Sequence, residues 1–116
     1  MSVTPPPPDS LPIALDRYLD HLRVERALMP ATLESYARDL REYLEWLESQ
    51  GILHISGVGR LHVLAHLSAL HARGLSRASQ ARHLAAVRGL HRAQIRAALE
   101  QVGREAVPQR VRVDVR

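Results

Sequence analysis

The chain has 116 residues, long enough for one domain with a modest core, and its 46% hydrophobic and 24% charged content is typical of a soluble globular protein. Cysteine is absent, which excludes a disulfide framework and thiolate chemistry and fits a cytoplasmic protein. No apolar run is as long as a membrane span, which needs about 20 residues. The start of the chain lacks the basic and apolar regions of a signal peptide. We therefore expect neither membrane insertion nor secretion.

The net charge of +4 is unevenly distributed along the chain. Residues 76–116 contain nine arginines and three acidic residues, whereas residues 28–50 contain two arginines and five acidic residues. All sixteen basic residues are arginine, whose planar guanidinium group is suited to phosphate. The positive potential in the last third of the chain therefore favours a polyanionic partner.

Residues 1–10 include four consecutive prolines, so we expect a disordered lead-in. A first helix is expected at about 11–27, because its large apolar residues recur on one side of a helical wheel. The charged residues Asp16, Asp20 and Arg23 fall on the other side. The apolar stripe consists of Leu11, Leu15, Tyr18, Leu19 and Leu22.

A second helix is predicted from Pro30 to Gln50, because proline is tolerated at a first helical position and Gly51 can cap the end. Its outer face allows three ion pairs at four-residue spacing, Glu34 with Arg38, Arg38 with Glu42 and Arg41 with Glu45; the alternative is a solvated face of weak pairs. The apolar stripe is unbroken and consists of Leu33, Tyr36, Leu40, Tyr43, Leu44 and Leu47.

A third helix is predicted at about 60–73, after a loop with two glycines and before Gly74. Its expected inner side carries Val63, Leu64, Leu67 and Leu70. His62 and His66 are four residues apart, as two zinc ligands on one helix would be. No glutamate follows His62 and no third ligand is evident, so we expect two surface histidines and no metal site.

A fourth helix is predicted from the N-cap Ser76 to about Gly103, although Gly89 could bend it or end it early. Residues 104–116 are expected to form a loose basic tail, in which Val111, Val113 and Val115 alternate with polar residues and allow a short strand or an arm. The sequence therefore predicts an all-α protein, in which residues 11–103 form a compact four-helix bundle.

The predicted fourth helix has two unlike faces. One contains Gln80, Leu84, Val87, His91 and Ala98, and His83 lies towards it, so both histidines are expected in or near the core. The other has arginines, small residues and no acidic residue, so an anionic partner is favoured over an ordinary charged exterior. Its members are Ala78, Arg82, Ala85, Gly89, Arg92 and Arg96.

Residues for catalysis are not evident in the chain. It has no Gly-x-Ser-x-Gly elbow, no phosphate-binding glycine loop and no spaced pair of carboxylates. We therefore expect a non-catalytic domain that needs no cofactor and has no small-molecule substrate.

Three segments together resemble the N-terminal core-binding, SAM-like domain of tyrosine recombinases, nearest to the Xer type and more distantly to phage integrases and Cre. They are Leu15-Asp16-Arg17-Tyr18-Leu19-Asp20-His21-Leu22, Ala31-Thr32-Leu33-Glu34-Ser35-Tyr36-Ala37-Arg38-Asp39-Leu40, and Gly74-Leu75-Ser76 through Val87-Arg88-Gly89-Leu90-His91. The resemblance covers about residues 11–92.

The resemblance implies one half of a C-shaped clamp around double-stranded DNA, with the second and fourth helices at the major groove. It also implies that the catalytic arginine, His-x-x-Arg and tyrosine set lies in a second domain absent from this chain. Most contacts should position the duplex through phosphate, with Arg82 the best candidate for reading guanine. Together with the arginine face, the candidate DNA-binding residues are Thr32, Ser35, Arg38, Arg77, Ser79, Arg82, Arg88, Arg92 and Arg96.

The chain departs from the family pattern at three places. Met29 stands where a serine cap is usual, Glu34 where a basic residue is common, and the match is lost after His91.

Alternative hypotheses are a helical module that binds other proteins, including other recombinase protomers, and a small helix-turn-helix regulator. The last is disfavoured because no short recognition helix is evident.

Overall fold

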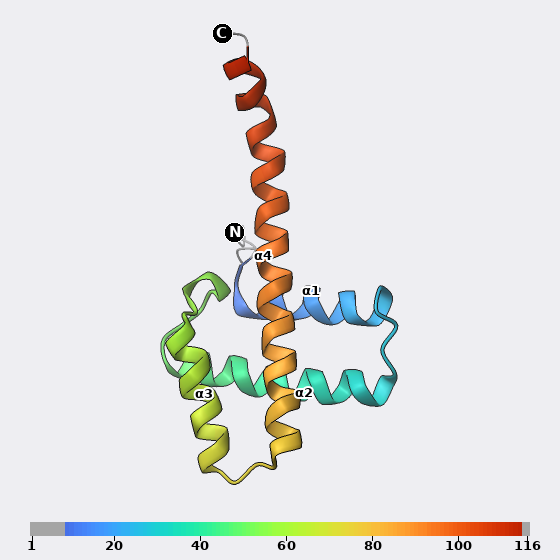
Figure 1. Cartoon of the computed structure of the whole chain (residues 1–116), viewed down its shortest axis with the longest axis vertical. Helices are drawn as coiled ribbons and strands as arrows, with labels where there is room; N and C mark the ends of the chain where they lie inside the picture. The colour runs from blue at the N-terminus through green and yellow to red at the C-terminus, as the bar shows by residue number, and fades with distance from the viewer. Residues whose placement is uncertain (1–8, 115–116) are drawn as a thin grey trace, which may run out of the picture.

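The computed structural model describes the backbone of residues 9–114 and the side chains of residues 9–104. Within this part the fold is all-α, as predicted, and contains no strand. Helices α1 and α2 lie side by side behind the long α4, and α3 runs beside the first part of α4 (Figure 1). The elements are α1 (Leu11–Val24), α2 (Pro30–Ser49), the short 3-10 helix η1 (Ile55–Gly57), α3 (Arg60–Ala72) and α4 (Arg77–Asp114).

The core lies where α1, α2 and α4 meet. The apolar stripes predicted for the first two helices are confirmed, although Leu19, Leu33 and Tyr36 are only partly buried. Each fully buried leucine contributes about 1.5–3 kcal/mol of transfer free energy, so this contact holds the three helices together. The helices α1 and α2 supply Leu11, Leu15, Tyr18, Leu22, Leu40, Tyr43, Leu44 and Leu47, and α4 supplies Ala86, Val87 and Leu90.

Helix α3 sits at the edge of this core and is rotated from its predicted orientation. Leu70 is fully buried, but Leu64 is 46% exposed. His66 is buried instead, at 3% exposure, so the prediction of a surface histidine is wrong. The reason is that α3 carries apolar residues on several sides. Its own sequence therefore does not determine which side is buried, and packing against α2 and α4 does.

The helix ends follow local backbone chemistry. Gly51 and Gly74 adopt φ values of 83° and 85°, which confirms them as the residues that close α2 and α3. Ser76 caps α4, since its hydroxyl accepts a hydrogen bond from the Ser79 N–H at 3.1 Å. Helix α1 ends at Val24 and not at 27, because the chain reverses at Ala27, where φ is 48°.

The start of α1 is tied to the linker between α2 and α3. The N–H of Leu11 donates to the carbonyl of Leu53 at 3.1 Å, and the N–H of Ile55 donates to the carbonyl of Asp9 at 2.7 Å. The Ser56 hydroxyl also donates to the Asp9 carboxylate at 2.7 Å. Asp9 and Ser10 therefore belong to the fold, and residues 1–8 of the expected lead-in lie outside the described residues.

Helix α4 continues past the body of the domain as a single rod (Figure 1). The predicted end near Gly103 and the loose tail or strand after it are corrected for residues 104–114, which are helical; the last two residues lie outside the described range. Most residues from 92 to 107 are strong helix formers, and one glycine costs only about 1 kcal/mol. Along the described length of the chain, none of the helices combines the length and apolar character needed to cross a membrane.

Candidate nucleic-acid interface

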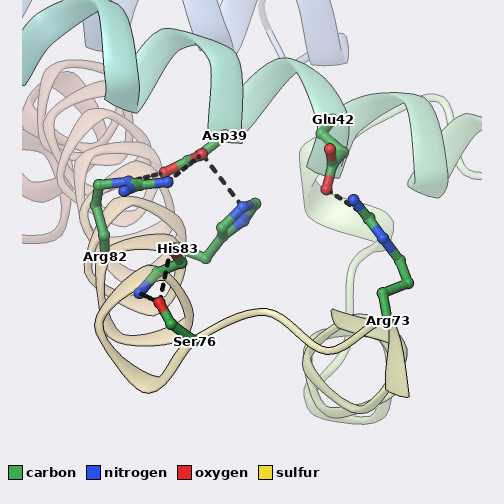
Figure 2. A network of polar contacts seen from close by, with 7 residues as sticks. Asp39, Glu42, Arg73, Ser76, Arg82 and His83 are labelled. Carbon is green, nitrogen blue, oxygen red and sulfur yellow. Dashed lines mark hydrogen bonds and ion pairs between the residues drawn. The ribbon is translucent and has the colours of Figure 1, made fainter. Parts of the chain in front are cut away.

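The crossing of α2 and α4 is organised around the carboxylate of Asp39, which is only 4% exposed. Arg82 donates to it twice, from Nε to Oδ2 at 2.6 Å and from Nη2 to Oδ1 at 3.2 Å. His83 Nε2 lies 3.2 Å from the same Oδ1 (Figure 2). Two adjacent residues of α4 thus hold one buried acid of α2.

The expectation that no acidic residue neutralises the arginine face is therefore wrong at Arg82. The acid comes from α2, 43 positions earlier in the chain, so a wheel of the fourth helix alone could not show it. The hydrogen bond with Asp39 raises the pKa of Arg82, and its side chain remains 35% exposed. Arg82 is consequently a fixed, partly exposed cation and not a free one.

Gly89 has a different role from the one predicted. A side chain at this position would overlap the hydroxyl and ring of Tyr18. The small residue admits an aromatic ring of α1 against α4, and it does not leave an opening for an outside partner.

The other candidate arginines of α4 are open to solvent. Arg77, Arg88, Arg92 and Arg96 are all exposed. Within the side chains that the structure describes, none of these four guanidinium groups forms an ion pair or a hydrogen bond. Their donors are therefore available to an anionic partner.

Helix α2 presents two exposed candidates, Thr32 and Arg38, and a half-buried one, Ser35. None of the three expected ion pairs along α2 forms among the described residues. Glu42 instead bonds Arg73 beyond the end of α3, at 2.8 Å, which joins the two helices (Figure 2). Arg38 is thereby left without an acidic partner in the described region.

Ser79 occupies the first turn of α4 and is half-buried. Its hydroxyl accepts a hydrogen bond from the Ser76 hydroxyl at 3.1 Å, so it takes part in the cap of the helix. It lies one turn before Arg82 on the same helix, and its hydroxyl can still donate to a partner.

Histidines line the buried space between α2, α3 and α4. The His66 ring lies 5.0 Å from Tyr43 and 5.9 Å from His83, measured between ring centroids. The expectation for His83 and His91 is confirmed, since the first is buried and the second is half-buried and bonded to the Tyr43 hydroxyl at 2.8 Å. His62 lies at the start of α3, where its Nδ1 accepts from the Gly59 N–H at 2.9 Å.

The rings of His66 and His91 are held in their neutral forms. Burial, followed by the proximity of His83, lowers the pKa of His66 to about 4. Burial also lowers the pKa of His91 and raises that of Tyr43, so both groups are neutral in their hydrogen bond. Among the described residues, no three histidine or acidic side chains are grouped as a metal ion would require.

Two features of this region were missed by reasoning from the sequence, the acid at Asp39 and the Tyr43–His91 pair. Asp39 did give a signal, because it lies next to Leu40 at the edge of the apolar stripe of α2, where an acid needs a partner when it is buried. The pairing itself depends on where α4 crosses α2.

The chain matches the family model for the phage integrase N-terminal SAM-like domain over residues 15–98. It is 46% identical over 90 residues to the tyrosine recombinase XerD of Mycobacterium tuberculosis strain H37Rv, which covers 72% of this chain and 29% of that protein. It is 42% identical over 77 residues to the tyrosine recombinase XerC of Pseudomonas fluorescens, which covers 66% of this chain and 26% of that protein. The chain thus spans less than a third of these relatives. No solved structure gives a significant match.

Proposed function

This chain belongs to the phage integrase N-terminal SAM-like domain family and forms a domain of the tyrosine recombinase type, and we propose that it binds double-stranded DNA at a recombination half-site. Helices α2 and α4 would contact the major groove and the flanking phosphates. The domain would act without catalysis of its own and would need no cofactor. The proposed contacts are Thr32, Ser35 and Arg38 on α2, and Arg77, Ser79, Arg82, Arg88, Arg92 and Arg96 on α4.

The observation that carries this proposal is the row of exposed, unpaired arginines on the outer side of α4. Arg88, Arg92 and Arg96 are spaced by four residues, so they follow one side of the helix. A duplex carries one negative charge per about 1.7 Å of its axis, and neutralising its phosphates releases counterions. Such a row suits a sugar-phosphate backbone better than a single anion.

The test is the salt dependence of binding to a fluorescently labelled random-sequence duplex. We expect a dissociation constant of about 10⁻⁴ to 10⁻⁶ M near physiological salt, the range of non-specific binding. Each phosphate contact contributes about −0.9 to the slope of log affinity against log salt. The triple variant Arg88→Ala/Arg92→Ala/Arg96→Ala should therefore lose affinity and flatten the slope by about 2 to 3.

The matched control is Arg17→Ala/Arg23→Ala/Arg26→Ala, which removes the same charge from exposed positions on α1 and the turn after it. It should retain most of the slope. Equal losses in the two triple variants would mean that binding follows net charge alone, and the proposed face would be abandoned.

A second candidate function is a protein-interaction module, favoured by apolar residues on the far part of α4. Ile95, Leu99 and Val102 are between 59% and 66% exposed and follow each other at helical spacing. A groove between α3 and α4 adjoins them and is lined by Leu64, Leu67 and Ile95, among others. A self-associating species in sedimentation, together with no DNA binding at low salt, would favour this function over the first.

A further inference from the structure

We infer that Asp39 is a positioning residue for DNA recognition, which orients Arg82 so that the free edge of its guanidinium group meets the duplex. This inference rests on the proposed function and names the residue that prepares one of its contacts. Asp39 does not touch DNA in this arrangement, because its carboxylate is buried beneath Arg82 and His83.

The carboxylate holds only one edge of the guanidinium group. Asp39 takes the edge formed by Nε and Nη2, with one oxygen for each nitrogen. Arginine has five N–H donors in a planar fork, so the edge formed by Nη1 and the second hydrogen of Nη2 is left over. Nη1 has no bonding partner among the described residues and is not one of their buried unpaired atoms, so solvent reaches it.

The free edge has the geometry that DNA recognition uses. Two parallel N–H donors match the O6 and N7 acceptors of guanine in the major groove, and they also match two oxygens of a phosphate. Because Asp39 fixes the plane of the group, its free edge has a fixed direction. An arginine without this support would have to give up its side-chain freedom on binding.

His83 keeps the carboxylate itself in place. Its Nε2 contacts the Oδ1 that also accepts from Nη2 of Arg82, and its ring is 4% exposed. The side chain of Asp39 is therefore held from two directions by neighbours on α4. The whole arrangement is set when α2 packs on α4, before any DNA arrives.

The inference predicts an effect opposite in sign to that of simple electrostatics. Replacing Asp39 with asparagine removes a negative charge near the proposed interface, and charge alone would then strengthen binding to DNA. Loss of the two-pronged contact frees the guanidinium group, and positioning therefore predicts weaker binding. The direction of the change separates the two explanations.

The experiment measures duplex binding by wild type, Asp39→Asn, Arg82→Ala and the double variant at one low salt concentration. The probes are a random-sequence duplex and the site that wild type enriches from a randomised duplex library. We expect Asp39→Asn to weaken binding to the enriched site by about 3- to 10-fold, the range for immobilising one long side chain. In the Arg82→Ala background the same change should have no further weakening effect.

The matched control is Glu42→Gln, which removes the other acid of α2 that pairs with an arginine, at the Arg73 contact. It carries the same change of charge and should not weaken binding. Thermal unfolding followed by circular dichroism confirms that each variant is folded at the temperature of the assay. If Asp39→Asn is unfolded, an NMR measurement on the wild type takes the place of the binding assay on this variant. The Arg82 Nε–H proton should then exchange slowly with water both without and with the duplex.

The outcomes distinguish this inference from the proposed function. Tighter or unchanged binding by Asp39→Asn, with Arg82→Ala weakened, overturns the inference and leaves DNA binding intact. Arg82→Ala with wild-type affinity also overturns it, as does loss of the slow Nε–H signal on adding duplex. No binding by the wild type overturns the proposed function as well.

Discussion

The hydroxyl of Tyr18 on α1 fills the space that a side chain at residue 89 of α4 would occupy. Tyr18 is 7% exposed, so its ring is part of the core and cannot swing freely into solvent. Gly89 thus lets the ring of Tyr18 pack directly against the backbone of α4. The close contact explains why a residue with poor helix propensity stands in the middle of a helix.

Replacing Gly89 with alanine should destabilise the domain. Alanine normally stabilises a helix interior by about 0.5–1 kcal/mol relative to glycine, but here its methyl group would overlap the Tyr18 ring. Overpacking of this kind costs about 1–3 kcal/mol. Urea unfolding of Gly89→Ala should therefore show a lower free energy of unfolding than wild type.

The control is Gly103→Ala in the same helix, where nothing lies within 4 Å of the added methyl group. This variant should be as stable as wild type or slightly more stable. If both variants behave alike, the contact between Tyr18 and Gly89 does not limit the packing of α1 on α4.

Replacing Tyr43 with phenylalanine should cost about 1–3 kcal/mol of unfolding free energy, because it leaves Nε2 of His91 without its partner in a half-buried position. The measurement is urea unfolding near neutral pH. Tyr36→Phe removes the same atom from a half-buried tyrosine whose hydroxyl has no hydrogen bond among the described residues, so it should change stability much less. Similar losses for both variants would contradict the assigned hydrogen bond.

Removing the cap of α4 gives a more local prediction. Ser76→Ala should lower stability by about 1 kcal/mol, because the N–H of Ser79 loses its side-chain acceptor. Ser76→Asp should restore most of the loss, since a carboxylate also accepts this bond and suits the positive end of a helix. Thermal unfolding by circular dichroism measures both effects, and an aspartate variant no better than alanine would argue against capping at this residue.

Periodicity predicted α1 and α2 well because each buries one unbroken stripe of large apolar residues. It was less successful for α3, whose apolar residues surround the helix, so that His66 and not Leu64 faces the core. The candidate site shows the same limit. The exposed arginines of α4 could be predicted from one helix, but the partner of Arg82 could not, because Asp39 reaches it from a helix whose crossing point no local pattern specifies.

The burial of His66 predicts that the domain loses stability in mild acid. The pKa of His66 is about 4 in the folded state and about 6.5 when the residue is exposed in the unfolded chain. Between about pH 6.5 and pH 4, His66 is protonated in the unfolded chain but not in the folded protein. The free energy of unfolding therefore falls as the pH drops through this range. The loss of unfolding free energy due to His66 reaches about 2 kcal/mol by pH 5. The lowered pKa of His91 adds a further loss of the same sign.

The His66→Leu variant lacks this titrating group, so its free energy of unfolding should fall less than that of wild type between pH 6.5 and pH 4. Both ring nitrogens of His66 are buried without a hydrogen-bond partner, which gives leucine a further advantage at neutral pH. Urea unfolding at several pH values measures both effects. His71→Gln replaces an exposed histidine of α3 and should follow the wild-type profile, whereas a His66→Leu profile parallel to wild type would show that another group causes the acid loss.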